Sequence, residues 1–540
     1  DVFYAVHKES GAERAVKVIA KEDLEEEYCN SPQTILEEFL ILRDLDHPNV
    51  LKVYELFEDV HNYYIITDII PGGELYDEIA TLGTLTEPET QVLMNSVLSA
   101  LNYCHQRTLV HRDLKPENIL LEQSGSYHNV KIIDFGLAKQ IIPAAPAPNH
   151  NNSTIDPPAV VVDNTDTVTD TDNDNDADPN QQQQQHPFMF TGLQGSCYYL
   201  APQVIVGSYT EKCDVWSCGV LAYLILAGFC PFDGETEADI HKEILHHNYD
   251  FEWDERDPIS DEAKDFVAYL LTYDEAERPT AEEALQHPWL QEYRRNSFGS
   301  DTSIRRATQQ SLSHLQHFQT SDCKLKQVAC AFIASQLINK QHSSQHTEEI
   351  DTVFRQLDLE CKGNLSQEDI QQRYQELFQQ ELSQEDTAQM FREINFSGSG
   401  RIEYSEFVIA QLLARNAIEQ ETIQAAFRYF DLEGKGFISP EDLKERLQLN
   451  EEEFHGDETL LDKYIVRRII EPVDINGNGR IEYEEFKTML LSRNDNNARR
   501  LSLRRSSSRK ALTEYHRFSL NNSAITELEE EWSESQTEEE

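Results

Sequence analysis

Four short acidic segments in the second half of the chain share one spacing of glycine and aliphatic residues. Each spans twelve residues between helical stretches, with glycine at position six and leucine or isoleucine at position eight. These residues are Gly363 and Leu365, Gly400 and Ile402, Gly436 and Ile438, and Gly479 and Ile481. The glycine permits a sharp turn, the aliphatic residue lets two loops pair, and oxygens at positions 1, 3, 5, 7, 9 and 12 can converge on one cation. This half of the chain is therefore predicted to be helical, with paired cation-binding loops.

The loops match the EF-hand motif, and the chemistry of their ligand positions ranks them. The fourth loop has oxygen at every ligand position and ends in a glutamate that can bind through both oxygens, so it is expected to bind Ca²⁺. Its ligands would be Asp474, Asn476, Asn478, the backbone carbonyl of Arg480, Glu482 and Glu485. The second loop has neutral oxygens at its first three ligand positions and is expected to bind more weakly. Its ligands would be Asn395, Ser397, Ser399, the backbone carbonyl of Arg401, Glu403 and Glu406.

The first and third loops depart from the calcium-binding pattern. Each has lysine at position five, Lys362 and Lys435, where an ammonium cannot coordinate a cation, and each ends in an aspartate one methylene short. Both are predicted to be weak or purely structural, so that each mainly scaffolds the better loop that follows it. Their candidate ligands are Asp358, Glu360, Asn364, Ser366 and Asp369 in the first, and Asp431, Glu433, Phe437, Ser439 and Asp442 in the third.

Three motifs in the first half of the chain supply the groups that phosphoryl transfer requires. They are Ala15-Val16-Lys17, then His111-Arg112-Asp113-Leu114-Lys115-Pro116-Glu117-Asn118, then Asp134-Phe135-Gly136. The reaction needs a group that accepts the hydroxyl proton, cations that neutralise the phosphate charge, and ligands that hold those cations. In this order and spacing the motifs resemble the protein kinase family, and the resemblance continues through Asp214-Val215-Trp216 and Arg278-Pro279-Thr280.

The kinase resemblance implies roles for individual residues. Asp113 would orient the substrate hydroxyl and accept its proton, with Lys115 near the transferred phosphate. Asn118 and Asp134 would supply oxygen ligands for Mg²⁺. ATP would contact Val2 and Ala15 around the adenine, Lys17 at the α- and β-phosphates, Glu38 as the ion-pair partner of Lys17, and Thr67 at the back of the pocket. Glu37 is the alternative partner of Lys17.

Three departures from the kinase pattern bear on activity. The alignment places the family's Gly-rich phosphate loop just before Asp1, so the chain is expected to be N-terminally truncated and to have poor activity as written. Gln203 stands where the family has a glutamate paired with the equivalent of Arg278, which keeps a hydrogen bond but loses the charge. Ser196 stands where threonine is usual and preserves the hydroxyl.

A basic substrate is indicated by Pro71-Gly72-Gly73-Glu74-Leu75. This segment resembles the start of the helix that meets basic residues before the target Ser or Thr in calmodulin-dependent kinase relatives, so Glu74 would bind a substrate Arg. An ordinary glutamate favoured at a helix N-terminus explains the residue equally well.

The combination resembles the calcium-dependent protein kinases of plants and protists. The expected fold is an α+β bilobal protein kinase followed by an all-α calmodulin-like domain with four EF-hands. The expected domains are the kinase domain at 1–290 with a disordered activation-segment insert at about 140–190, an autoinhibitory junction at 291–345, EF-hand pairs at 346–415 and 420–493, and a disordered tail at 494–540. The cofactors implied are ATP, Mg²⁺ and Ca²⁺.

Apolar residues recur at helical spacing from Ser311 to Leu337 and give each helix there one apolar face. The helix at Leu325 to Leu337 suits a junction helix that calcium-bound EF-hands could remove from the kinase. A plain bridging helix is the simpler alternative. The segment Arg305-Arg306-Ala307-Thr308 could act as a pseudosubstrate or an autophosphorylation site. A calcium-responsive scaffold that no longer transfers phosphate is the alternative function, and a kinase regulated by separate calmodulin is a lesser one.

Composition narrows the partners and the location. The net charge of -52 argues against nucleic acid and favours basic peptides and cations. Nine scattered cysteines indicate reduced thiols in a cytoplasmic protein, each expected to be a small buried side chain. No apolar stretch is long enough to span a membrane. The chain lacks an initiator Met, so a lipid anchor on a preceding segment stays open. We expect a monomer.

Overall fold

The computed structural model describes residues 2–8, 11–21, 39, 42–43, 45–135, 139–140, 196–251, 259–292, 302–318, 320, 323–336, 345–447 and 465–491. For residues 139–140, 335–336 and 345–348 it describes the backbone alone. The described residues form two compact units, one mainly from Lys17–Gly299 and the other mainly from Ser300–Glu540. The predicted insert, the tail, Glu37 and Glu38 lie outside the described residues, apart from the backbone of Gln140 in the insert.

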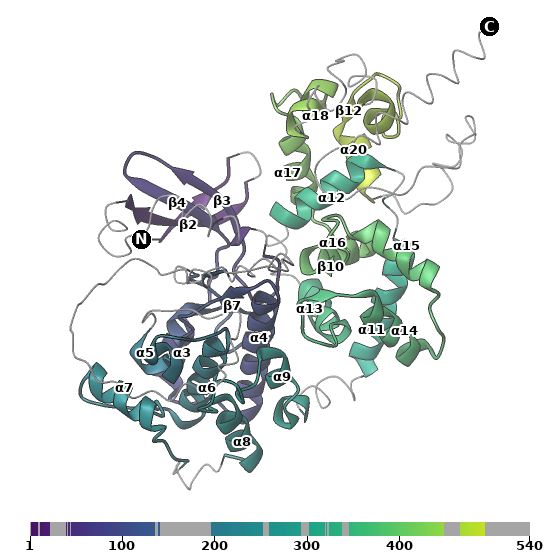
Figure 1. The fold of residues 1–540 in the computed structure, drawn as a ribbon. Helices are drawn as coiled ribbons and strands as arrows, with labels where there is room; N and C mark the ends of the chain where they lie inside the picture. The colour runs from purple at the N-terminus through teal and green to yellow at the C-terminus, as the bar shows by residue number, and fades with distance from the viewer. Residues whose placement is uncertain are drawn as a thin grey trace, which may run out of the picture. The chain divides into compact units, whose positions relative to one another are not determined.

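The described residues begin with a four-stranded sheet, in the order β1-β2-β4-β3, whose strands β3 and β4 belong to the first unit (Figure 1). Its strands are β1 (Val2–Val6), β2 (Glu13–Ala20), β3 (Val53–Glu58) and β4 (Asn62–Thr67). Strands β3 and β4 form an antiparallel hairpin in which Glu58 lies opposite Tyr63. The Asp59 carboxylate closes the turn by accepting hydrogen bonds from the backbone N–H groups of His61 and Asn62, both at 2.7 Å.

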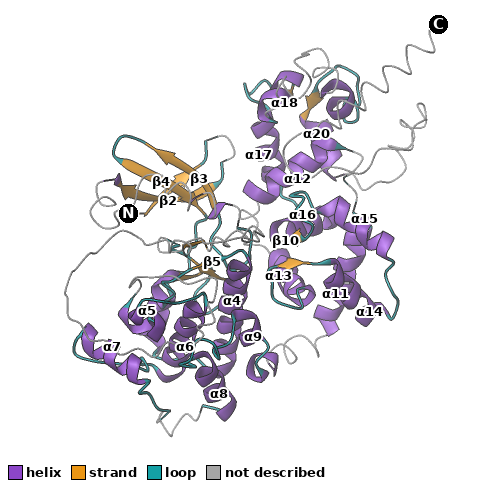
Figure 2. Ribbon diagram, in the orientation of Figure 1, coloured by secondary structure: helices purple, strands orange, loops and turns teal. Residues whose placement is uncertain are grey.

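Helices make up most of the remainder of this unit, as Figure 2 shows. They are α3 (Leu75–Leu82), α4 (Glu87–Gln106), α5 (Pro202–Val206), α6 (Lys212–Ala227), α7 (Glu237–His246), α8 (Asp261–Leu270) and α9 (Ala281–Leu285). Helix α4 starts at a capping box, because Glu89 accepts from the Thr86 backbone N–H at 2.9 Å. Helices α4 and α6 pack against each other in the core, and α6 is buried on nearly all sides, which explains its mostly apolar sequence.

Two short pairs of antiparallel strands and two 3₁₀ turns complete this unit. Strand β5 (Leu109–Val110) pairs with β8 (Lys139–Gln140), and β6 (Ile119–Leu121) pairs with β7 (Val130–Ile132). The turns are η1 (Pro116–Asn118) and η2 (Cys197–Tyr199). These elements present the motif residues of the first half of the chain.

The predicted EF-hand arrangement is confirmed in the second unit, where the loops pair through short strands. Strand β9 (Asn364–Leu365) pairs with β10 (Ile402–Glu403), and β11 (Phe437–Ile438) pairs with β12 (Ile481–Glu482). The position-eight residues face each other in both cases, Leu365 with Ile402 and Ile438 with Ile481. All four of these side chains are fully buried.

Helices flank each paired loop. They are α13 (Gln345–Leu357), α14 (Gln367–Phe378), α15 (Gln384–Ile394) and α16 (Tyr404–Arg415) in the first pair, and α17 (Gln420–Phe430), α18 (Pro440–Arg446), the π-helix η5 (Ile465–Ile470) and α20 (Tyr483–Leu491) in the second.

The apolar stripe predicted between 311 and 337 is divided between two helices, α11 (Thr302–Gln316) and α12 (Lys324–Gln336). Helix α11 packs against α13, α14, α15 and α16, and α12 packs against α16, α17 and α20. Leu325, Ala329 and Ile333 of α12 are fully buried. In this structure the apolar faces of both helices are covered by the EF-hand pairs.

Two expectations about individual residues need correction. Thr308 is 1% exposed and its hydroxyl donates to the Ile304 carbonyl at 2.9 Å, so α11 would have to leave its partners before this threonine could be phosphorylated. The cysteines are not all buried, because Cys197, Cys230 and Cys323 are only half-buried. Cys29 lies outside the described residues.

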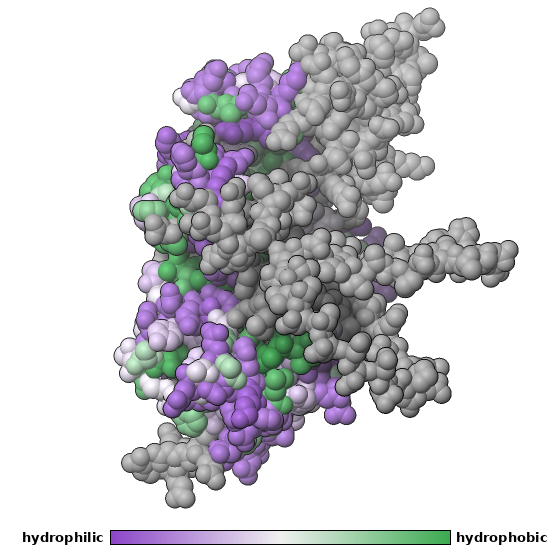
Figure 3. Space-filling model, turned by 60° about the vertical axis from the view of Figure 1, so that its left-hand side comes forward, coloured by the Kyte–Doolittle hydropathy of each residue, from purple (hydrophilic) through white to green (hydrophobic). Residues whose placement is uncertain are grey.

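Among the described residues on the face drawn in Figure 3, hydrophilic residues predominate and apolar residues gather in separate patches. None of the helices in the described part of the chain combines the length and apolar character that a membrane span requires.

Candidate functional site

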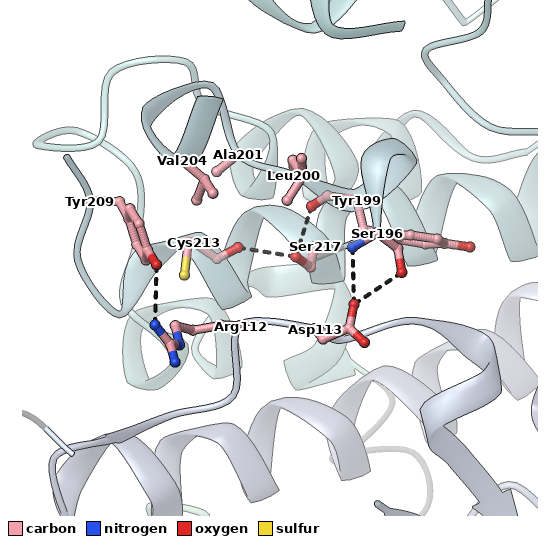
Figure 4. Close-up of a pocket in the computed structure, with 10 residues that line it drawn as sticks. All are labelled: Arg112, Asp113, Ser196, Tyr199, Leu200, Ala201, Val204, Tyr209, Cys213 and Ser217. Atoms are coloured by element: carbon pink, nitrogen blue, oxygen red, sulfur yellow. Dashed lines mark hydrogen bonds between the residues drawn. The ribbon is translucent and has the colours of Figure 1, made fainter. Parts of the chain in front are cut away.

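The loop between β5 and η1 gathers the predicted catalytic residues around the Asp113 carboxylate. Lys115 Nζ lies 2.8 Å from Asp113 Oδ2 and donates to Ser196 Oγ at 2.7 Å. Ser196 donates to Asp113 Oδ1 through both its backbone N–H and its hydroxyl, each at 3.0 Å. The carboxylate is therefore fixed from two sides, and Figure 4 shows Ser196 reaching it.

Asn118, at the end of η1, lies against the same aspartate. Its Nδ2 donates to the Asp113 backbone carbonyl at 2.7 Å and to Asp113 Oδ2 at 3.1 Å. Because the amide nitrogen faces Asp113, the amide oxygen Oδ1 is the atom that can bind a cation. Asn118 is 5% exposed, so this orientation is held by the protein interior.

Asp214, at the start of α6, fixes the backbone of the catalytic loop. Its carboxylate accepts from the backbone N–H of His111 at 2.9 Å and of Arg112 at 2.8 Å, and from His105 Nε2 at 2.8 Å. Arg112 has φ of 69°, a strained left-handed conformation that these bonds offset. Burial by itself would raise the pKa of Asp214, but the bonds from His105 and the backbone outweigh it and hold the pKa below the ordinary value.

Sequence reasoning assigned Asp214 only a structural place in its motif and did not connect it with the catalytic loop. A buried acidic residue at a helix start was the available signal.

Lys17 of β2 and Asp134 after β7 form an ion pair, with Lys17 Nζ 3.0 Å from Asp134 Oδ1. Their side chains are 41% and 43% exposed, so the pair is open to solvent and to a ligand. Asp134 has φ of 58°, and the next residue, Phe135, packs its ring 4.8 Å from the His111 ring. An exposed carboxylate beside an ammonium, with the Asn118 oxygen as a second hard ligand, suits a phosphate-bound divalent cation.

The other predicted ATP contacts are placed as follows. Thr67 ends β4 and is 8% exposed. Val2 lies on β1 and is exposed, and half-buried Ala15 lies on the neighbouring strand β2, two residues before Lys17 and hence on the same face of the sheet. Glu38 lies outside the described residues.

Gln203 and Arg278 are hydrogen-bonded, as the sequence led us to expect. Arg278 Nη2 donates to Gln203 Oε1 at 2.8 Å, while Gln203 Nε2 donates to the Tyr273 carbonyl at 2.7 Å. Arg278 also donates to the Thr272 carbonyl at 2.9 Å and stacks on Trp216. Arg278 is 1% exposed, and burial lowers its pKa to about 10. The glutamine thus satisfies a buried guanidinium without supplying a charge.

Glu74 is exposed and immediately precedes α3 without capping it through its side chain. Gly72, two residues before Glu74, packs its backbone closely on β6, because a Cβ there would lie 2.3 Å from the Leu121 carbonyl oxygen. That close approach lets Gly72 N–H donate to the same oxygen at 2.9 Å, which aligns this segment with β6.

A small cavity borders the catalytic loop (Figure 4). It is lined by Arg112, Asp113, Ser196, Tyr199, Leu200, Ala201, Val204, Tyr209, Cys213 and Ser217. Ser217 Oγ donates to the Tyr199 carbonyl at 2.9 Å, and Arg112 Nη1 donates to the Tyr209 hydroxyl at 3.4 Å. The first bond ties η2 to α6, and the second ties the segment before α6 to the loop that contains Asp113.

The fourth EF-hand loop is folded by its own ligand residues. Asp474 Oδ2 accepts from Gly479 N–H at 2.7 Å, and Glu485 Oε1 accepts from Asn476 N–H at 3.2 Å. Glu482 Oε1 accepts from Asn478 and from Arg480, at 3.1 and 3.2 Å. The oxygens of Asp, Asn and Glu side chains with a backbone carbonyl form a donor set that fits Ca²⁺.

The second loop has the same terminal arrangement. Glu406 Oε1 accepts from Ser397 N–H at 2.6 Å and Oε2 accepts from Glu403 N–H at 2.9 Å, while Asn395 Oδ1 accepts from Ser399 N–H at 3.1 Å. Burial raises the pKa of Glu406 to about 8. A cation would offset the cost of burying this carboxylate, so the residues fit calcium here as well. Arg401 donates to Asn364 Oδ1 at 2.9 Å and so links the second loop to the first.

The first and third loops keep the fold of the others but use shorter acids. In both, a serine at position nine and an aspartate at position twelve form the capping box of the following helix, Ser366 with Asp369 and Ser439 with Asp442. Asp358 accepts from Gly363 N–H and Asp431 from Gly436 N–H, both at 2.7 Å. Glu360 pairs with Lys362. Sequence reasoning missed that the pair of residues at positions nine and twelve also caps the helix, although the Ser-x-x-Asp spacing was visible.

No three His, Cys, Asp or Glu side chains are grouped as a metal site within the part of the chain that the structure describes. The loops instead combine carboxylates with Asn, Ser and backbone oxygens.

Comparison with known proteins gives two family matches. Residues 1–170 and 176–290 match the model of the protein kinase domain, and residues 347–412 and 420–491 match the model of the EF-hand domain pair. Calcium-dependent protein kinase 4 of Plasmodium falciparum (isolate 3D7) is 30% identical over 505 residues, covering 91% of this chain and 84% of its own. Calcium-dependent protein kinase 3 of Plasmodium berghei (strain Anka) is 33% identical over 489 residues, covering 91% and 77%. Calcium-dependent protein kinase 3 of Plasmodium yoelii yoelii is 34% identical over 442 residues, covering 82% and 71%.

Proposed function

Since this chain belongs to the calcium-dependent protein kinase family, we propose that calcium binding to its second and fourth EF-hands switches on phosphate transfer from ATP to Ser or Thr in basic sequences. The kinase domain implies ATP and Mg²⁺, and the EF-hand pairs imply Ca²⁺. The observation that carries the catalytic proposal is the convergence of Lys115, Ser196 and Asn118 on the Asp113 carboxylate.

Asp113 accepts the proton of the substrate hydroxyl and orients that hydroxyl for attack. Lys115 stabilises the charge on the transferred phosphate. Before substrate binds, its hydrogen bond to Ser196 holds the ammonium beside Asp113. Lys17 binds the α- and β-phosphates once it exchanges its contact with Asp134 for the nucleotide. Mg²⁺, when bound, neutralises phosphate charge, and Asn118 and Asp134 are the residues that would hold it.

Glu74 binds a basic side chain of the substrate. Its carboxylate is exposed at the start of α3, where the Gly72 contact fixes the backbone. Glu74→Gln should raise KM for a peptide with Arg three residues before Ser and leave kcat nearly unchanged, because only ground-state binding is lost. Asp77→Asn removes a neighbouring exposed carboxylate of α3 and is the matched control. An equal effect of both substitutions would contradict a specific role for Glu74.

Residues 291–345 form the autoinhibitory junction of the proposal. Helix α12 gives a stripe of buried side chains to the EF-hand pairs, so those pairs can compete for it with any other surface that binds the same stripe. Calcium would favour the form in which the EF-hand pairs hold α12, and the kinase domain would thereby be released from the junction. We propose that the protein acts as a monomer. The rival hypothesis is a scaffold that transfers no phosphate, and Gln203 in place of the usual glutamate favours it. The hydrogen bonds of Gln203 to Arg278 and to the Tyr273 carbonyl nevertheless anchor α5, so this substitution leaves the local fold intact.

The decisive experiment measures phosphate transfer from MgATP to the Arg-containing peptide by the purified full-length protein, with calcium and with chelator. Transfer that requires calcium supports the proposal, and Asp113→Ala should lower kcat by about 10² to 10⁴. Equal transfer in both conditions would contradict autoinhibition, but the proposal that the protein is a kinase would still hold. No transfer in either condition, with calcium binding intact, would favour the scaffold.

A further inference from the structure

The third EF-hand loop already contains a cation of its own, the ammonium of Lys435. Lys435 Nζ lies 3.1 Å from Asp442 Oδ1, 3.4 Å from Ser439 Oγ and 3.6 Å from Glu433 Oε2. These three residues occupy positions twelve, nine and three of the loop, which are ligand positions for calcium in an EF-hand. The ammonium therefore lies where a bound metal would meet the same side chains.

The rest of the third loop has the fold of the calcium-type fourth loop. Asp431 Oδ2 accepts from Gly436 N–H at 2.7 Å, and at the same positions Asp474 Oδ2 accepts from Gly479 N–H at 2.7 Å. Strands β11 and β12 pair the two loops in register. The third loop is thus not a collapsed remnant, because its turn, its strand and the start of its helix are all formed.

The residue at position twelve explains why an ammonium is needed. In the fourth loop Glu485 reaches across the loop, with Oε1 accepting from the N–H of Ile475 at 2.9 Å and Oε2 accepting from the N–H of Glu482 at 3.0 Å. Asp442 is one methylene shorter. Its Oδ2 accepts from Ser439 N–H at 2.8 Å, and its Oδ1 meets Lys435.

Burial strengthens this ion pair relative to one on the surface. The Asp442 side chain is 3% exposed and that of Lys435 26%, so solvent screens the pair only partly. The first loop provides a comparison at the same position, because Lys362 pairs with Glu360, whose side chain is 55% exposed. Both lysines thus pair with the glutamate at position three of their loop, and Lys435 in addition lies 3.1 Å from the buried Asp442 carboxylate.

We propose that Lys435 is a tethered cation that replaces calcium in the third EF-hand, so that this hand stays folded in the absence of calcium and binds none. The third loop then keeps β11 in position to pair with β12. The fourth loop therefore binds calcium while the third loop, its pairing partner, is already folded. This inference goes beyond the proposed kinase function, since it concerns how one hand is kept folded and depends on no step of phosphate transfer.

Hydrogen exchange of the full-length protein in chelator tests the proposal directly. The backbone amides of residues 431–442 should be protected without calcium, and Lys435→Met, which removes the charge but keeps the side-chain length, should speed their exchange by about tenfold or more. Lys362→Met makes the same change at position five of the first loop and should leave residues 431–442 unaffected. A third loop that is protected only after calcium is added, or equal exchange in the two variants, would overturn the proposal.

Calcium stoichiometry, measured by equilibrium dialysis, gives the second test. Lys435→Asp replaces the ammonium with an oxygen ligand, so the variant should bind about one calcium ion more than the unaltered protein. An unchanged count would contradict the claim that the lysine is what excludes the metal. Neither measurement uses kinase activity, so failure here would leave the proposed function standing, and failure of calcium-dependent transfer would leave this inference standing.

Discussion

At the residue scale, the Asp113 carboxylate depends on hydrogen bonds that come from a distant part of the chain. Ser196 supplies two of them, one from its backbone and one from its hydroxyl. The hydroxyl also accepts from Lys115. A single serine therefore links the base to the lysine that would meet the phosphate.

Ser196→Ala should reduce kcat by about tenfold, because one hydrogen bond to a charged group is lost while the backbone bond remains. Ser196→Thr keeps the hydroxyl and should retain most of the activity. Steady-state kinetics on the Arg-containing peptide separates the two. If alanine and threonine variants lose activity equally, the side chain acts through packing and not through its hydroxyl.

The hydrogen bonds of Arg278 lead to a second prediction at this scale, about the stability of the first unit. It is buried with its charge, and Gln203 is a side-chain acceptor for its Nη2 group. Gln203→Leu should destabilise the first unit by about 1.5 to 3 kcal/mol, since a hydrogen bond to a charged group is removed. The midpoint of thermal unfolding measures the loss.

Gln203→Glu is the informative comparison for this site. The carboxylate would gain a charge interaction with Arg278 but lose the donor to the Tyr273 carbonyl, so its midpoint should stay near that of the unaltered protein. A Leu variant as stable as the Glu variant would show that Arg278 finds other acceptors.

At the element scale, the short strands pair each EF-hand loop that we expect to be weak with the loop that follows it. Ile438 and Ile481 face each other and are fully buried. Neither is a calcium ligand. The pairing nevertheless sets where the oxygens of both loops can lie.

Ile438→Ala should lower the calcium affinity of the fourth loop by about tenfold, because part of the roughly 2 to 5 kcal/mol cost of truncating a buried isoleucine falls on the paired state. Calcium titration of the full-length protein measures this. Leu365→Ala makes a similar change in the first pair, where Leu365 faces Ile402, and should weaken the second loop instead. If both variants lose calcium affinity at the same EF-hand loop, coupling through the paired strands is refuted.

At the scale of the whole molecule, regulation requires that the junction have two alternative partners. Helix α12 contacts α17 through Phe332, whose ring stacks on Tyr429 at 3.8 Å between centroids. Such aromatic contacts contribute about 0.5 to 1.5 kcal/mol beyond burial. That energy is on the scale of a tenfold change in an equilibrium.

Phe332→Ala should therefore raise the calcium concentration needed for half-maximal kinase activity by about tenfold, as the EF-hand pairs hold α12 less tightly. Tyr374→Ala removes an aromatic stack within α14, on Phe378, and is the matched control. If Phe332→Ala instead lowers the calcium concentration needed for half-maximal activity, this phenylalanine stabilises the inhibited form.

The sequence by itself determined the kinase and EF-hand character of the chain, and the predicted ranking of the four loops also rests on sequence alone. Those conclusions rest on residues close together along the chain, since twelve consecutive positions hold all the ligands of one loop and eight hold Asp113, Lys115 and Asn118. Local spacing constrains local geometry, so such groups are recognisable before folding is known.

Only the tertiary structure decided which side chains meet across long separations or turn inward. It placed Asp214 under the backbone of the catalytic loop, brought Ser196 to Asp113, buried Thr308, and directed Lys435 to Asp442. Both lysines at position five pair with the glutamate at position three, but that Lys435 also meets the buried Asp442 was not visible in the sequence. Such outcomes depend on how packed elements orient each rotamer, and no local pattern encodes that orientation.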